Sequence, residues 1–189
     1  MLGEWKLNRM KRKDFVPKMV EQLKEDLQLK SPPRKIEAFD LSHLGGTNTV
    51  ASMVSFFDGK PKKNEYRKYN IKTVEGIDDF ASMREVVLRR YSRVKKEGLG
   101  FPDLILIDGG KGQLSMAVSA LRELGLEYIT VIGIAKRLEE VFVPGHSDPQ
   151  NIPKSSSGLI LLRRIRDEAH RFAITFQRTK RKKTSLKSV

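Results

Sequence analysis

Apolar positions near the start of the chain recur every three or four residues, which is the period of one face of an α-helix. Between residues 16 and 27 this spacing predicts an amphipathic helix over residues 18–29. Ser31-Pro32-Pro33 ends the predicted helix, because proline lacks the backbone N–H that would continue it. We therefore begin the main domain at residue 35 and interpret residues 1–34 as an N-terminal linker that carries the helix.

The pattern then changes to short apolar stretches separated by turn residues, which is typical of strands. Gly45-Gly46 and Asp58-Gly59-Lys60-Pro61 are such turns, so three antiparallel strands are predicted at residues 36–42, 49–57 and 65–71. Helical and strand-like patterns alternate in the rest of the chain. The predicted helices cover residues 78–96, 111–124 and 157–178, and the predicted strands cover residues 103–107 and 128–135, with a short further strand at 140–143.

This order of elements predicts an α/β fold with a mixed five-stranded sheet flanked by helices. Hairpins supply the antiparallel part of such a sheet, and right-handed crossovers supply the parallel part. The first strand commonly lies beside the fourth and parallel to it, so the carboxyl ends of these two strands meet at one edge. Ligands of open α/β sheets bind at such an edge.

The charge of the chain is concentrated at its ends. The formal net charge is +14 over 189 residues; residues 1–35 hold 10 Lys/Arg and 5 Asp/Glu, and residues 178–189 hold 6 Lys/Arg and no acid. Basic ends favour a polyanionic partner, most often nucleic acid, although solvated tails would have the same composition. We interpret residues 179–189 as a basic disordered tail.

The composition excludes several classes of protein. Without cysteine, the chain can form no disulfide scaffold, thiolate metal site or cysteine nucleophile. No apolar run approaches about 18 residues, and no apolar stretch follows the basic N-terminus, so we expect neither a membrane span nor a signal peptide. We therefore expect a cytoplasmic protein with no membrane partner.

Two aspartates occupy the predicted edge of the sheet. Asp40 lies in the first predicted strand, and Asp108 directly follows the apolar run at 104–107, before Gly109-Gly110. If these strands are neighbours, the two carboxylates repel each other unless a divalent cation lies between them. Oxygen ligands alone favour Mg²⁺ or Mn²⁺, a combination used in phosphodiester hydrolysis. In the alternative interpretation, Asp40 makes a turn hydrogen bond and Asp108 caps the next helix.

His170 and Asp79 are further candidates with weaker support. His170 lies one position past the apolar stripe of the last predicted helix, at the rim of the core. Beside two aspartates it would be a metal ligand or would move a proton, whereas a lone helical histidine is more often a surface or hydrogen-bonded residue. Asp79 follows Asp78 at a predicted helix start, where the helix dipole by itself favours a carboxylate.

Basic residues near the predicted strand ends are candidates for phosphate contacts, and each could equally be a solvated surface residue. Tyr66-Arg67-Lys68-Tyr69 mixes cations with aromatic residues on one strand, which suits a surface that meets nucleic acid. Gly109-Gly110-Lys111-Gly112-Gln113 lacks the spacer and the Ser/Thr of a P-loop, so we exclude that nucleotide site. The candidate DNA-binding residues are His43, Arg67, Lys68, Lys111, Lys136 and Arg137.

Several motifs follow one another along the chain in a specific order. They are Phe39-Asp40-Leu41-Ser42-His43, Tyr66-Arg67-Lys68-Tyr69-Asn70-Ile71, Asp78-Asp79-Phe80, Ile107-Asp108-Gly109-Gly110-Lys111-Gly112-Gln113 and Arg166-Asp167-Glu168-Ala169-His170-Arg171. Together they resemble the C-terminal endonuclease domain of UvrC, the incision subunit of bacterial nucleotide excision repair. The resemblance covers residues 14–178. It implies an RNase H-like fold and a metal-dependent endonuclease that cuts the damaged strand on the 5′ side of the lesion.

The resemblance also implies site residues, a cofactor and partners. Asp40, Asp108 and His170 match the catalytic, metal-binding Asp-Asp-His set of the family, and Asp79 matches a further aspartate of its Asp-Asp pair. The implied cofactor is Mg²⁺ or Mn²⁺, and the implied partners are damaged double-stranded DNA and, in the full-length protein, UvrB. We expect the UvrB-binding segment, the GIY-YIG nuclease domain and the helix-hairpin-helix repeats of full-length relatives to be absent from this chain.

The residues alone leave two other functions open. Another RNase H-like enzyme, such as a recombinase or an Argonaute-like nuclease, would use similar acids. A non-catalytic nucleic-acid-binding module would keep the acids for structural reasons. A Mn²⁺ site that disappears with Asp40→Ala would distinguish an enzyme from a binding module.

Overall fold

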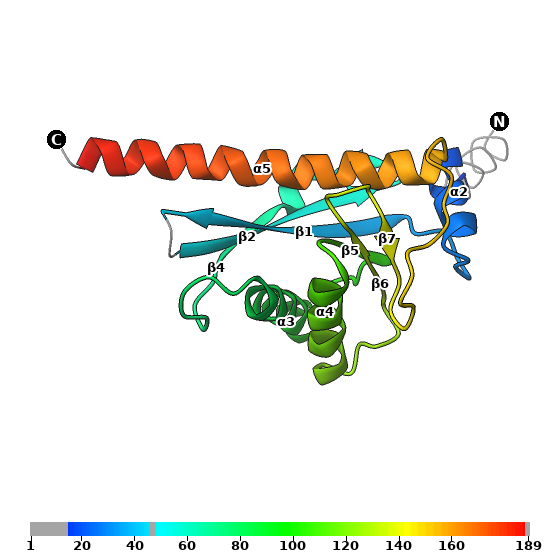
Figure 1. Cartoon of the computed structure of the whole chain (residues 1–189), viewed down its shortest axis with the longest axis horizontal. Helices are drawn as coiled ribbons and strands as arrows, with labels where there is room; N and C mark the ends of the chain where they lie inside the picture. Colours follow the sequence, from blue (N-terminus) through cyan, green and yellow to red (C-terminus); the bar gives the residue numbers. More distant parts are fainter. Residues whose placement is uncertain (1–14, 46–47, 188–189) are drawn as a thin grey trace, which may run out of the picture.

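A computed structural model shows the architecture of the chain (Figure 1). It describes the backbone of residues 15–45 and 48–187 and the side chains as far as Thr175. The helices are α2 (Lys18–Asp26), η1 (Lys63–Glu65, 3₁₀), α3 (Asp79–Glu97), α4 (Lys111–Glu123) and α5 (Ser157–Lys187). The strands are β1 (Lys35–Leu44), β2 (Asn48–Phe57), β3 (Lys60–Pro61), β4 (Arg67–Asn70), β5 (Leu104–Asp108), β6 (Thr130–Ile134) and β7 (Val141–Phe142).

A seven-stranded mixed sheet forms the centre of the fold, with the order β3-β2-β1-β5-β6-β7 and with β4 paired to β2. β1 pairs with β2 in antiparallel and with β5 in parallel, which confirms the predicted neighbours. The predicted number of five strands is too low, because β3 and β7 also join the sheet. β7 matches the short strand predicted at 140–143, whereas β3, with two residues, is too short to show a period of its own in the sequence.

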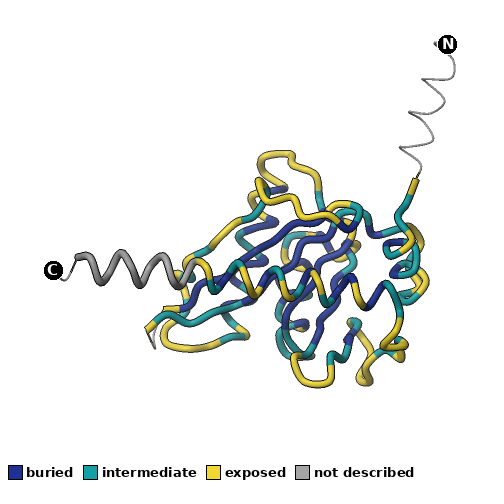
Figure 2. Tube along the Cα trace, turned by 90° about the horizontal axis from the view of Figure 1, so that it is seen from above, coloured by how far each residue is buried: buried dark blue, intermediate teal, exposed yellow. Residues whose placement is uncertain are grey.

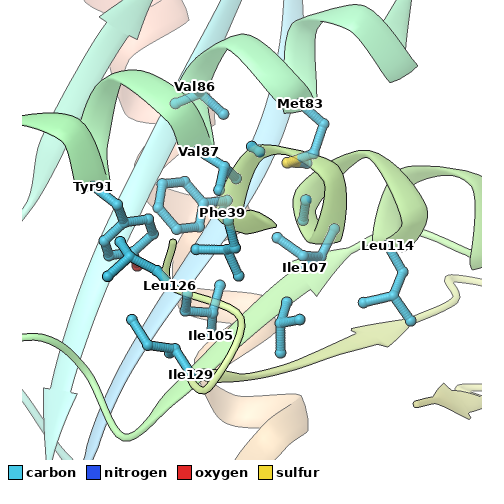
Figure 3. Close-up of a cluster of buried hydrophobic side chains, with 14 of the residues drawn as sticks. Phe39, Met83, Val86, Val87, Tyr91, Ile105, Ile107, Leu114, Leu126 and Ile129 are labelled. Atoms are coloured by element: carbon cyan, nitrogen blue, oxygen red, sulfur yellow. The ribbon is translucent and has the colours of Figure 1, made fainter. Parts of the chain in front are cut away.

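The helices cover both faces of the sheet: α5 lies along one face, and α3 and α4 cover the other (Figure 1). Successive residues of a strand point to opposite faces, so Ile36 and Ala38 pack in the core beneath α5, whereas Phe39 packs in the core beneath α3 and α4. The buried segments follow the central strands (Figure 2). Figure 3 shows the core beneath α3 and α4, with Phe39, Met83, Val86, Val87, Tyr91, Ile105, Ile107, Leu114, Leu126 and Ile129 labelled.

Both predicted ends of the domain differ from the structure. α2 lies in the predicted linker, yet its Val20 and Leu23 are completely buried in the core that α5 covers, so the folded unit extends back to this helix. α5 continues over residues 179–187, beyond the predicted helix end at residue 178. This segment contains neither proline nor glycine that would end a helix. Residues 1–14 and 188–189 lie outside the described part of the chain.

Among the helices of residues 15–45 and 48–187, none has the length and apolar character needed to cross a membrane.

Candidate active site

Asp40 and Asp108 lie side by side at the carboxyl ends of two central parallel strands. The register pairs Phe39 of β1 with Ile107 of β5, so the next residue on each strand is an aspartate. Ala38 and Leu106, two residues earlier, belong to the core beneath α5, and both aspartates point to this same face. Asp40 is 2% exposed and Asp108 is 7% exposed. The fold thus buries two carboxyl groups next to each other.

This pair is electrostatically strained. Burial is the main cause that raises the pKa of Asp108 to about 7, and the neighbouring Asp40 carboxylate also contributes, whereas the charge of Lys136 acts in the opposite direction. Oδ1 of Asp108 is buried and accepts no hydrogen bond from the described residues. Both aspartates face a pocket of ≈ 240 Å³. Its lining residues are Asp40, Leu41, Asp79, Asp108, Gly109, Gly110, Gln113, Ala135 and Lys136.

The pair fits a divalent cation. Two adjacent carboxylates repel each other, and a cation between them would relieve both this repulsion and the cost of burial. The unpartnered Oδ1 of Asp108 is an available hard oxygen ligand, as Mg²⁺ and Mn²⁺ prefer. Within the described residues, no three His, Cys, Asp or Glu side chains are grouped as a set of metal ligands. The predicted third ligand, His170, therefore stays a prediction.

His170 reaches the aspartate pair from α5. Its Nδ1 lies 3.3 Å from Oδ2 of Asp40, and 59% of its side chain is exposed. The neighbouring turns of α5 are fixed to the sheet through Tyr66, whose hydroxyl donates to Glu168 (2.8 Å) and whose ring meets Phe172 edge-on at 5.1 Å. Because Glu168 and Phe172 flank His170 in sequence, these contacts set the rotation of α5 that turns the imidazole toward Asp40.

Asp79 brings a third carboxylate to the pocket wall. It is the first residue of α3, and Asp78 before it takes the capping role by accepting a hydrogen bond from the Ala81 N–H at 3.1 Å. Oδ1 of Asp79 lies 3.0 Å from Nε2 of His43, at ion-pair distance but without the alignment of a hydrogen bond. Nδ1 of the same imidazole lies 3.2 Å from Oγ1 of Thr49. His43 thus orients Asp79, a role that the sequence did not suggest.

The other predicted DNA-binding residues are spread over the surface. Among the described residues, Lys136 is the one basic side chain that lines the aspartate pocket, and exposed Arg137 follows it. The Lys111 ammonium lies 5.4 Å from the centre of the Phe142 ring and borders a separate pocket of ≈ 430 Å³.

Two of the predicted DNA contacts lie at β4. Arg67 donates hydrogen bonds to the backbone carbonyls of Asn64 (3.0 Å) and Tyr66 (2.8 Å). The Lys68 ammonium lies 4.5 Å from the centre of the Phe172 ring, next to the turn of α5 that carries His170, and burial lowers its pKa. Of these two residues, Lys68 thus contacts the helix that carries His170.

Sequence reasoning missed two residues of the site. Arg166 is on α5, its charge lowers the pKa of Asp108, and its guanidinium donates to Glu139 at 3.3 Å and Asp167 at 3.0 Å. Its position four residues before His170 places both on one helix face, and this spacing could have identified it. Gln113 lines the pocket, and its Oε1 is buried without a hydrogen-bond partner in the described chain. No sequence pattern distinguished its side chain.

The chain is similar in sequence to known proteins. Residues 24–174 match the family described as the UvrC RNase H endonuclease domain. The UvrABC system protein C of Christiangramia forsetii is 58% identical over 172 residues, which cover 90% of this chain and 29% of that protein. Its counterpart from Salinibacter ruber is 52% identical over 191 residues, covering 99% of this chain and 30% of that protein. The chain thus spans less than a third of the length of these relatives.

Among solved structures, an endonuclease V from Bacillus subtilis aligns with 84% of this chain and 91% of its own chain. The sequence identity is 13% and the TM-score is 0.39. This similarity is too low to support an argument about the site.

Proposed function

Because this chain belongs to the UvrC RNase H endonuclease domain family, we propose that it hydrolyses a phosphodiester bond of damaged double-stranded DNA on the 5′ side of the lesion. The observation that carries the proposal is the buried pair of Asp40 and Asp108 at the carboxyl ends of β1 and β5. A fold that needed these positions only for stability would gain from neutral residues there. The side of the cut is supported by the resemblance of the sequence motifs to the UvrC domain.

Asp40 and Asp108 would hold Mg²⁺ or Mn²⁺. Their burial, their mutual repulsion and the unpartnered Oδ1 of Asp108 support this assignment. When bound, a divalent cation supplies Lewis-acid stabilisation of the charge that develops on the scissile phosphate. Asp79, oriented by His43, adds a further acceptor on the pocket wall.

Basic groups around the pair have complementary roles. Lys136 lies on the pocket wall, where its ammonium would contact a non-bridging phosphate oxygen. His170, which lies against Oδ2 of Asp40, would hold or transfer a proton beside the scissile bond. Arg166 links Glu139, at the end of the loop after β6, to α5, and this link keeps the loop of Lys136 next to the helix of His170.

Two further proposals concern the full-length protein. We propose that it acts in nucleotide excision repair together with UvrB, through a segment outside the residues that match the family. The contact with DNA is supported by the net charge of +14 and by the basic side chains near the pocket.

The test uses the full-length protein with a lesion-containing duplex labelled at both ends of the damaged strand. Asp40→Asn should lower the rate of the 5′ cut by roughly 100-fold or more, and His170→Ala by a similar factor. The exposed Asp148 offers a matched control, because Asp148→Asn removes the same charge away from the pocket. Normal 5′ cutting by Asp40→Asn would refute the catalytic assignment.

Metal binding needs a readout that does not depend on cutting. Mn²⁺ titrated into the metal-free protein should lose its free-ion electron paramagnetic resonance signal on binding. Asp40→Asn should abolish this loss, whereas Asp148→Asn should preserve it. An unchanged Mn²⁺ affinity in Asp40→Asn would exclude the pair as the metal site.

A further inference from the structure

Phe80 is an exposed aromatic residue at the rim of the aspartate pocket. It is the second residue of α3 and directly follows Asp79, which lines the pocket. Its exposed fraction is 52%, although most of the phenylalanines of the described chain are more buried. A single exposed aromatic side chain is not unusual by itself, but the residue that lies beneath this ring is.

Gly112 lies directly against the ring. It is the second residue of α4, between the pocket-lining residues Gly110 and Gln113. A Cβ atom at position 112 would lie 2.4 Å from Cζ and 2.7 Å from Cε1 of Phe80, so only glycine leaves room for the ring. Glycine inside a helix is less stable than alanine, and here it lets the outer edge of an aromatic ring rest on the α4 backbone.

The contact with Gly112 holds the Phe80 ring at the pocket rim instead of in the core. The edge of the ring is held by Gly112, and half of the side-chain surface stays accessible to solvent. Asp79, which precedes Phe80, and Gly110 and Gln113, which lie on either side of Gly112 in sequence, belong to the wall of the pocket that would take the scissile phosphate. A flat apolar surface is therefore present next to the proposed reaction centre.

We propose that Phe80 is a stacking platform for a nucleobase adjacent to the scissile phosphate, an inference that rests on the proposed function. Neighbouring bases of a strand are separated by about 3.4 Å along the helix axis, so a base next to a phosphate in the pocket passes the rim. Stacking on an aromatic ring tolerates every base, because each base has a π-face. Such a contact positions the strand without reading its sequence, as a repair nuclease that cuts beside lesions in any context requires.

The experiment measures stacking and cutting separately in the full-length protein. For stacking, 2-aminopurine replaces single bases on either side of the 5′ cutting site, and the duplex is bound by the Asp40→Asn variant, which would leave the DNA intact. Phe80 should quench the fluorescence at one of these positions. Adding Phe80→Leu, which keeps an apolar side chain without the π-face, should restore the fluorescence, and adding Phe80→Trp should preserve the quenching.

For cutting, the single variants are compared with wild type at DNA concentrations below saturation. Phe80→Leu should lower the efficiency of the 5′ cut about tenfold or more, and Phe80→Trp should retain most of it. Tyr128→Leu is the matched control, since Tyr128 is 73% exposed and precedes β6 at the opposite edge of the sheet, and it should cut normally. Gly112→Ala should displace the ring and reproduce the defect of Phe80→Leu.

Two outcomes would refute the role of Phe80 as a stacking platform. One is Phe80→Leu cutting at the wild-type rate, and the other is a cutting defect without any change in 2-aminopurine fluorescence, which would assign the ring to packing alone. In either case the proposed function stands as long as Asp40→Asn prevents the cut. If Asp40→Asn cuts normally, the proposed function itself fails, so the two failures are distinguishable.

Discussion

Replacing Asp108 with asparagine should stabilise the metal-free protein. The substitution keeps the shape of the side chain and removes its charge. In the native state the Asp108 carboxyl is 7% exposed and adjacent to Asp40, and burial together with this neighbour raises its pKa to about 7 from an ordinary value of 3.8. Ionisation of Asp108 at neutral pH therefore costs folding free energy, and asparagine avoids that cost.

The size of the effect follows from the pKa of Asp108. At about 1.36 kcal/mol per pKa unit, raising the pKa from 3.8 to about 7 corresponds to about 4 kcal/mol above pH 7. The native state holds this proton more tightly than the unfolded chain, so the free energy of unfolding falls as the pH rises from about 4 to about 7. Asp108→Asn should remove this fall, and the two proteins should be equally stable below pH 4.

Urea unfolding followed by circular dichroism at 222 nm, with a chelator present, measures the difference at each pH. Asp148→Asn serves as the control, because it removes an exposed aspartate that does not line the pocket of the pair and should change stability little. Added Mn²⁺ should stabilise wild type by mass action and should stabilise Asp108→Asn less. An Asp108→Asn variant that is less stable than wild type at pH 8 without metal would refute the reasoning and assign the carboxylate a structural role.

Two further predictions concern other parts of the molecule. Glu37→Ala should destabilise the fold by about 3–5 kcal/mol in urea unfolding, because its loss leaves the buried charge of Arg90 unpaired. Glu37 is completely buried and accepts hydrogen bonds from Arg90 (3.0 Å) and Tyr91 (2.8 Å). A change below about 1 kcal/mol would contradict this account. Ending the chain at Arg178 removes five Lys/Arg residues. The slope of the logarithm of DNA affinity against the logarithm of salt concentration should therefore become shallower by up to about 0.9 per cation. An unchanged slope would show that this segment does not contact DNA.

Local sequence patterns determined the elements and much of their arrangement. The predicted strands at residues 36–42 and 103–107 and the helix at 78–96 agree with β1, β5 and α3 to within a few residues. The adjacency of Asp40 and Asp108 also followed, because hairpins and right-handed crossovers leave few arrangements for this order of elements. The features that follow from the hydrophobic period and from the rules of chain connection could therefore be predicted without a structure.

The contacts that shape the site were decided by the tertiary structure. The sequence contains Phe80 and Gly112 as separate members of two motifs, and only the packing of α3 against α4 brings the ring onto the glycine. In the same way, His43 meets Asp79 because the end of β1 lies at the start of α3, and Val20 and Leu23 of α2 are buried because α2 packs against α5.

The physical reason is that these contacts join residues far apart in the chain. Their distances depend on how helices are placed on the sheet and on the rotamers of the side chains, and neither leaves a periodic trace in the sequence. The raised pKa of Asp108 is of the same kind, since it depends on burial and on a neighbour 68 positions away. The sequence alone determined which residues carry the charge, and the fold determined the free-energy cost of that charge.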